Sequence, residues 1–198
     1  QRLVLLVLLW LQPERFYEER GIEVRRGVTA TALSPAKQRV WLSSGEVVSW
    51  DKVIIATGSS PRRLAVPGAE LPGVHSVRTW EDAVALREAL LPGSRVVVVG
   101  GGLLGLEVAS AATERGAHAT VLERGSAVLS RSLGALAGAA LTPFLEDRGV
   151  VVRLRAEVER VHGTSRVEGV VTNRGEHHAA DLVVFALGAV PAIGWLAG

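Results

Sequence analysis

The stretch Arg95-Val96-Val97-Val98-Val99-Gly100-Gly101-Gly102-Leu103-Leu104-Gly105 decides the fold of this chain. Its four valines form a continuous β-branched run, which is typical of a strand buried on both faces of a parallel sheet. The glycines that follow have the spacing G-x-G-x-x-G. That spacing alone is a weak signal, because a chain with 22 glycines produces such matches by accident. The flanking residues therefore have to decide its meaning.

The residues after the glycines predict a helix and then a second strand. Leu104, Val108 and Ala112 recur at helical spacing, and Gly116 follows as a stop signal. Residues 118–122 return to a strand pattern. Strand, loop, helix and strand make up a βαβ unit of about 30 residues, as in dinucleotide-binding folds.

Each glycine of the loop has a predicted physical role in that unit. Gly100 allows a tight turn, Gly102 lets the backbone approach a diphosphate, and Gly105 lets the helix pack close to the strand. The diphosphate would lie at the helix N-terminus, where unpaired N–H groups face it. Glu123 stands at the end of the second strand, where a carboxylate accepts both ribose hydroxyls and repels a 2′-phosphate. This favours NAD(H) over NADP(H), although the adjacent Arg124 could soften the preference.

A repeat divides the chain into two similar modules. The pattern D-x-V-x-x-A-x-G-x-x-P occurs at residues 51–61 and again at 181–191. Residues 19–25 and 147–153 also match, and each reads as a helix end, a glycine cap and a strand. A counterpart of the glycine-rich loop in the first module would fall before the start of the chain. We therefore expect a fragment whose first module lacks its opening βαβ unit.

Three further segments complete the predicted architecture. Residues 79–82 form a capping box that opens a helix through Leu90, and residues 133–147 read as a crossover helix. Residues 158–162 and 167–172 read as an antiparallel excursion closed by a turn. The predicted fold class is α/β, a Rossmann-like doubly wound parallel sheet with an appended antiparallel excursion.

Composition excludes several classes of function. The net charge is only +2, and the basic residues are scattered, so we expect no nucleic-acid partner. Cysteine is absent, which excludes disulfides, thiolate metal sites and redox-active cysteine pairs. The five histidines form no metal-ligand pattern with nearby carboxylates, so we expect no metal.

An apolar run from Leu3 to Leu11 is the most hydrophobic stretch. It is far shorter than the roughly 20 residues that span a bilayer. We favour a buried helix or a truncated edge of the fold, with a targeting segment as the alternative. The expected protein is cytoplasmic and binds no membrane.

Once these motifs are assembled, the chain resembles the two-dinucleotide-fold flavoproteins, the FAD-dependent pyridine-nucleotide oxidoreductases. The glycine-rich loop, Glu107, Glu123 and the paired D-x-V-x-x-A-x-G blocks carry the resemblance. Residues 54–62 resemble the family's ATG motif, and residues 66–68 and 78–83 resemble its crossover into the NAD domain. The similarity is greatest to NADH-dependent ferredoxin or rubredoxin reductases and to the large subunit of NADH-dependent nitrite reductase.

The resemblance implies roles for individual residues. Glu107 would lie near the flavin and the nicotinamide, or else is an exposed helix acid; no catalytic residue is assigned otherwise. Gly188 would pass close to the nicotinamide. The remaining positions would contact the two cofactors: Ala30, Ala56, Thr57, Gly58 and Arg62 for FAD, and Gly100, Gly102, Leu103, Leu104, Gly105, Glu123 and Arg124 for NAD(H).

The resemblance also implies an activity and a domain plan. Hydride would pass from NADH to FAD, and electrons would pass on to a small redox protein or a small-molecule acceptor. Residues 1–67 would belong to a partial FAD-binding domain, 68–190 to an inserted NAD(H)-binding domain, and 191–198 to the return toward the FAD domain. Without cysteine, turnover through a dithiol is excluded.

Two other functions stay open from the residues alone. One is a non-catalytic module that binds NAD(H) without a flavin. The other is a one-domain NAD-dependent dehydrogenase, which is disfavoured because Tyr17, the single tyrosine, has no lysine four positions on.

Overall fold

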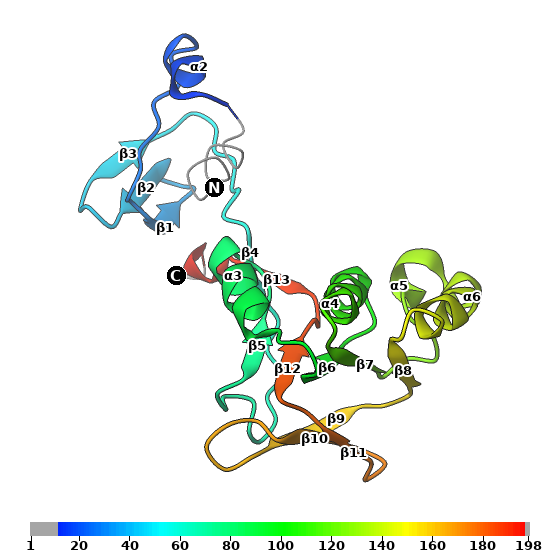
Figure 1. Ribbon diagram of the computed structural model, residues 1–198. Helices are drawn as coiled ribbons and strands as arrows, with labels where there is room; N and C mark the ends of the chain where they lie inside the picture. The colour runs from blue at the N-terminus through cyan, green and yellow to red at the C-terminus, as the bar shows by residue number, and fades with distance from the viewer. Residues whose placement is uncertain (1–11, 197–198) are drawn as a thin grey trace. The chain divides into compact units, whose positions relative to one another are not determined.

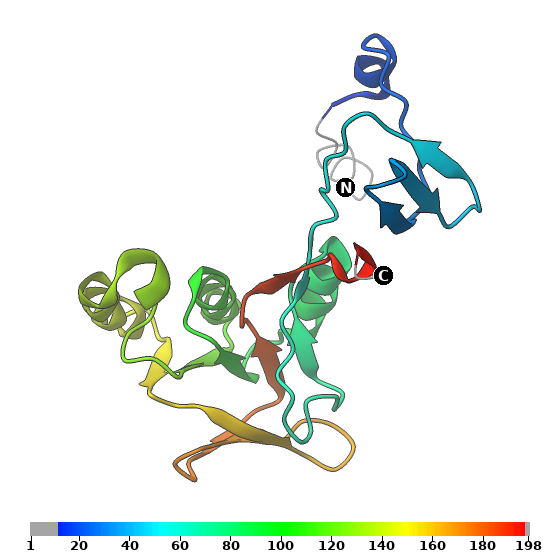
Figure 2. The ribbon, with the colours of Figure 1, turned by 180° about the vertical axis from the view of Figure 1, so that it is seen from behind.

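The computed structural model describes residues 12–196, which fall into two compact units (Figures 1 and 2). Unit 2 is contiguous and spans Gly58–Ala192, whereas unit 1 combines Gln1–Thr57 with Ile193–Gly198. The apolar run Leu3–Leu11, for which we expected a buried helix or a targeting segment, lies outside the described residues. Within residues 12–196, none of the helices has both the length and the apolar character that crossing a bilayer requires.

Unit 2 is built on a five-stranded sheet in which every neighbouring pair is parallel. The predicted strand at Val96–Val99 is confirmed as part of β6, at the centre of the sheet, and all four valines are buried. β5 was not predicted, because three residues are too few to show a period. In spatial order the strands are β5 (Val74–Ser76), β12 (Leu182–Phe185), β6 (Arg95–Val99), β7 (His118–Glu123) and β8 (Val151–Leu154).

Successive valines of β6 pack on opposite faces of the sheet. Val96 and Val98 face the helices α3 (Trp80–Ala89), α4 (Leu103–Glu114) and α6 (Ala135–Glu146). Val97 and Val99 face a second, three-stranded antiparallel sheet (Figure 1). In spatial order its strands are β11 (His177–Ala179), β10 (Gly169–Thr172) and β9 (Val158–His162). The α/β class and the parallel sheet are confirmed, with the antiparallel excursion covering the face that the helices leave open.

The predicted helix boundaries hold to within a few residues. Thr79 caps α3 through a reciprocal box: the Asp82 amide donates to the Thr79 hydroxyl over 3.2 Å, and the Thr79 amide donates to the Asp82 carboxylate over 2.9 Å. The predicted helix at 133–147 is α6, preceded by the short helix α5 (Ser130–Leu133). Gly134 separates the two with a φ of 82°, a left-handed value that favours glycine.

For the matched segments 19–25 and 147–153, the predicted glycine caps are confirmed, but the strand predicted in the first segment is wrong. The Ile22 amide donates to the Tyr17 carbonyl over 2.9 Å, and the Val150 amide makes the equivalent bond to Leu145 over 3.1 Å. Strand β8 follows in unit 2, whereas residues 22–25 have no regular secondary structure. Residues 53–56 likewise form no strand. A parallel strand needs a hydrogen-bonded neighbour, and within residues 12–57 neither segment has one.

The tails of the two repeated motifs pair with each other. β4 (Ser59–Pro61) and β13 (Ala189–Pro191) form an antiparallel ribbon. Matching bonds flank it: the Arg62 amide donates to the Gly188 carbonyl and the Ala192 amide to the Gly58 carbonyl, each over 2.9 Å. The repeat therefore has a structural meaning, since each of these two bonds is the counterpart of the other when the two motifs are exchanged.

Unit 1 contains a small meander and little buried surface. β1 (Ala30–Ser34), β2 (Arg39–Leu42) and β3 (Val47–Ser49) form its sheet. The helix α2 (Glu14–Glu18) and the short helix η1 (Gly194–Leu196) complete it, and η1 packs against β1. Among the described residues, every fully buried hydrophobic side chain belongs to unit 2.

Asp181, the first residue of the second repeated motif, joins the N-terminal ends of β12 and β6. Its carboxylate accepts hydrogen bonds from Nη2 of Arg95 over 2.7 Å, from Nε over 3.0 Å and from the Arg95 backbone amide over 2.8 Å. The Arg95 side chain, and then its backbone amide, lower the pKa of Asp181 from its ordinary 3.8 to about 2.

Replacing Asp181 with asparagine is expected to lower the free energy of unfolding at pH 7 by about 1 kcal/mol, a modest value because the pair is partly exposed and screened. The folded-state pKa lies below the unfolded one, so the stabilisation is complete above about pH 4 and declines as the pH falls toward 2. Urea unfolding between pH 7 and pH 2.5 should show the difference shrinking. Asp51→Asn, in the first repeat, should change little, and a difference independent of pH would contradict this role.

Candidate dinucleotide-binding site

The glycine-rich loop lies at the carboxyl end of β6, between the sheet and α4. Gly100 has a φ of 112°, and its amide donates to the Leu122 carbonyl over 2.8 Å. A Cβ built on Gly100 would lie 2.5 Å from the Ala186 carbonyl oxygen. Gly100 therefore makes the tight turn that the sequence predicts, in a space that admits no side chain.

Gly105 lies in the first turns of α4 and packs directly on the loop. A Cβ on Gly105 would lie 2.0 Å from the Gly100 carbonyl oxygen, so only glycine allows this approach of helix and strand. Gly102 caps α4, and a Cβ there would meet nothing within 4 Å. The packing roles predicted for Gly100 and Gly105 are confirmed, and Gly102 borders open space.

The N-terminus of α4 is available to a ligand. No side chain within residues 12–196 caps it, and the first turn carries no acid. The first N–H groups of a helix lack partners within the helix and lie at the positive end of its dipole. Such a terminus, approached through an open glycine, can bind a phosphate or diphosphate.

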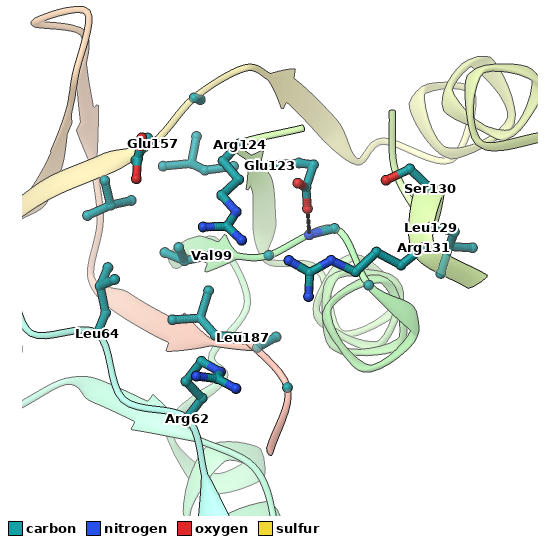
Figure 3. Close-up of a pocket in the computed structure, with 18 of the residues that line it drawn as sticks. Arg62, Leu64, Val99, Glu123, Arg124, Leu129, Ser130, Arg131, Glu157 and Leu187 are labelled. Atoms are coloured by element: carbon teal, nitrogen blue, oxygen red, sulfur yellow. Dashed lines mark hydrogen bonds between the residues drawn. The ribbon is translucent and has the colours of Figure 1, made fainter. Parts of the chain in front are cut away.

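Glu123 ends β7 directly beside this loop, as the sequence predicts. One carboxylate oxygen, Oε2, accepts from the Gly101 amide over 2.7 Å (Figure 3). The other, Oε1, accepts from the Gly125 amide over 2.6 Å. The side chain is half-buried, so part of it still faces the loop's surroundings. The carboxylate therefore lies at a fixed place next to the proposed diphosphate position.

A hollow of about 550 Å³ opens over this edge of the sheet (Figure 3). The side chains of Arg124 and Arg131 extend toward the glycine-rich loop from different sides. Arg62 lies at the wall of the hollow that faces Arg124. Within residues 12–196 neither Arg124 nor Arg131 forms an ion pair, so both can attract an anion. The lining is Arg62–Leu64, Val99–Gly102, Leu122–Arg124, Leu129–Ser132, Ala156–Val158 and Ala186–Gly188.

Several of the predicted site residues meet at this hollow. Gly100, Gly102, Glu123, Arg124 and Gly188 line it, and so does Arg62, which the resemblance assigned to FAD. Two further predicted residues, Leu103 and Leu104, lie exposed on the first turn of α4, above the buried Gly105. Ala30, Ala56 and Thr57 belong to unit 1, while Gly58 begins unit 2.

Glu107 lies elsewhere on α4, exposed, in the wall of a separate apolar groove of about 250 Å³. Leu86 of α3, Leu90 directly after α3 and Val108 of α4 contribute to the lining of that groove. The position fits an exposed helix acid as well as a residue near a second cofactor, and its predicted role stays a prediction.

Sequence reasoning missed Arg131 and Glu157 in the hollow. Arg131 is brought there by Leu129, which adopts a φ of 51° and whose amide donates to the Gly101 carbonyl over 2.8 Å. The break at Gly134 is the signal that could have indicated a short turn here. Glu157 follows β8, and nothing in its neighbourhood indicates a pocket. Residues 12–196 contain no group of three histidines or carboxylates arranged to bind a metal ion.

Comparison with known proteins gives consistent matches over nearly the whole chain. Residues 9–197 match the family model described as pyridine nucleotide-disulphide oxidoreductase. A ferredoxin–NAD(+) reductase subunit of a benzene 1,2-dioxygenase system from Pseudomonas putida is 40% identical, over 89% of this chain and 43% of the relative. A rubredoxin–NAD(+) reductase from Pseudomonas putida is 37% identical, over 91% of this chain and 47% of the relative.

Solved structures agree in fold. The crystal structure of a ferredoxin reductase from Rhodopseudomonas palustris superposes with a TM-score of 0.87 at 28% identity, over 93% of this chain and 46% of the other. The chain thus spans less than half the length of the relatives it matches.

Proposed function

Since the chain belongs to the pyridine nucleotide-disulphide oxidoreductase family, we propose that it supplies the NAD(H)-binding part of an FAD-dependent reductase. The observation that carries the proposal is the contact between Glu123 and the Gly101 amide over 2.7 Å. This contact places a carboxylate that can bind a ribose beside the glycine-rich loop and the α4 N-terminus, which can bind a diphosphate. These are the groups that a dinucleotide fold uses.

The nucleotide would lie across the carboxyl edge of the sheet. Its diphosphate would bind at the α4 N-terminus through Gly102, Leu103 and Leu104, with Arg131 available to its charge. The adenosine ribose would bind Glu123, and the nicotinamide end would extend toward Gly188. A 2′-phosphate would lie next to the Glu123 carboxylate, and the two negative charges would repel each other. We therefore propose NADH as the preferred donor, with Arg124 limiting how strongly NADPH is excluded.

The two cofactors supply the chemistry, which is hydride transfer from the nicotinamide to the flavin. The protein's part is to orient the rings and to exclude water. We propose that Ala30, Ala56, Thr57, Gly58 and Arg62 contribute to FAD binding. Residues 1–67 and 191–198 would belong to the FAD domain and 68–190 to the NAD(H) domain.

The electron acceptor is proposed from the relatives. Two of them are named for ferredoxin and rubredoxin, which are small redox proteins. We infer that the reductase containing this chain passes electrons to an acceptor of that class.

Titration with NADH tests the proposal directly. Binding should enhance NADH fluorescence and saturate, and NADPH should bind about tenfold more weakly or worse, because a carboxylate hydrogen bond is lost and a repulsion gained. Absence of saturable NADH binding would overturn it. Adding FAD to the same protein and following flavin absorbance after gel filtration then separates a reductase part from a module that binds only NAD(H).

A further inference from the structure

Gly125 contributes the second of the two hydrogen bonds that hold the Glu123 carboxylate. Its amide donates to Oε1 over 2.6 Å, while the Gly101 amide donates to Oε2 over 2.7 Å. Each oxygen therefore has one protein donor and keeps a lone pair for a ligand hydroxyl. Charge-assisted bonds of this length are among the strong hydrogen bonds of proteins.

The Gly125 donor is itself fixed in place. The Gly125 carbonyl accepts from the Arg155 amide over 2.9 Å, and the Glu123 carbonyl accepts from the Ala156 amide over 3.0 Å. These two backbone bonds tie the turn after β7 to the residues after β8. The amide that holds Glu123 is thus part of a rigid connection between neighbouring strands.

Arg124 and Arg131 would otherwise compete for the same carboxylate. Both line the hollow with Glu123, and within residues 12–196 neither forms an ion pair. A carboxylate free to rotate would be drawn toward either guanidinium, because opposite charges attract and arginine binds carboxylates in a matching geometry. The ribose would then lose its acceptor, and a 2′-phosphate would meet less repulsion.

We propose that Gly125 is a positioning residue that holds Glu123 against the pull of Arg124 and Arg131, and thereby sets the preference for NADH over NADPH. The proposal rests on the proposed function. A Cβ at Gly125 would lie 2.9 Å from Oε1 of Glu123, while its next neighbour is 3.7 Å away. Gly125 is not among the residues with positive φ, so alanine is compatible with its backbone. Gly125→Ala should therefore displace the carboxylate and little else.

The experiment compares NADH and NADPH dissociation constants, measured by fluorescence titration, for the wild type, Gly125→Ala and the neighbouring exposed Ser126→Ala. In Gly125→Ala the ratio of NADPH to NADH dissociation constants should fall about tenfold, the effect of one charge-assisted hydrogen bond. Ser126→Ala should retain the wild-type ratio. A general loss of folded protein weakens the binding of both nucleotides equally and leaves the ratio of their dissociation constants unchanged. A change in the ratio therefore reports the position of the Glu123 carboxylate.

A double-mutant cycle identifies the group through which Gly125 acts. In a Glu123→Gln background, Gly125→Ala should cause no further change in the ratio, because the carboxylate it positions is gone. An equal change in both backgrounds would overturn the proposal, as would a wild-type ratio in Gly125→Ala. Failure of the wild type to bind NADH would instead overturn the proposed function.

Discussion

Replacing Gly105 with alanine is expected to abolish measurable NADH binding and to lower the free energy of unfolding of unit 2 by about 3 kcal/mol, the upper range for an overpacked site. The added Cβ would lie 2.0 Å from the Gly100 carbonyl oxygen and 3.3 Å from the Ala186 Cβ. The first obstacle is backbone, which cannot rotate aside as a side chain can. The helix would have to move away from the strand, and the α4 N-terminus would leave its place at the hollow.

Gly102→Ala is the matched control for this prediction. A Cβ there meets nothing within 4 Å, so stability should fall by less than about 1 kcal/mol, the scale of a helix-cap change. NADH binding should still weaken about tenfold, because the methyl group occupies space through which a diphosphate approaches the backbone. Urea unfolding and NADH titration of both variants separate the two effects. A Gly105→Ala protein with wild-type stability would contradict the packing argument.

Replacing Glu123 with glutamine is expected to reverse the nucleotide preference, changing the ratio of NADH to NADPH affinity by about a hundredfold. The side chain keeps its size but loses its charge, so a 2′-phosphate no longer meets a carboxylate. Arg124 and Arg131 remain in the hollow, and within residues 12–196 no acid forms an ion pair with either of them. They would bind the additional phosphate, for which arginine is well suited.

NADH affinity should fall about tenfold in the same variant, because one of the two amide donors, Gly101 or Gly125, then faces an NH₂ group instead of an oxygen. Titration with both nucleotides measures the change. Glu157→Gln, at another wall of the hollow, is the control and should retain the NADH preference. If Glu123→Gln still excluded NADPH as strongly as the wild type, the carboxylate would not be the group that distinguishes the nucleotides.

The part of the fold that follows from local rules could be predicted from the sequence. The valine run predicted β6, and helical spacing followed by a glycine stop predicted α4 and the return to β7. The capping box at Thr79 predicted the start of α3. Glu123 was placed beside the loop because both stand at carboxyl ends of adjacent parallel strands. In each case the determining residues are close together in the chain.

The features that escaped prediction depend on distant partners. The pairing of β4 with β13 joins residues about 130 positions apart, such as Ser60 and Val190. Arg131 reaches the hollow only because Leu129 bonds the Gly101 backbone. Residues 22–25 show the opposite case, since this strand-like pattern forms no strand and has no parallel neighbour within residues 12–57.

The division of the chain also has a consequence for biosynthesis. Unit 2 is continuous, so all of its sheet can assemble as soon as the ribosome has released Ala192. Unit 1 includes η1, which packs on β1 but follows unit 2 in the chain. The residues of unit 1 that precede Gly58 therefore leave the ribosome well before η1 does, and the sheet of unit 2 can be complete before β1 gains that contact.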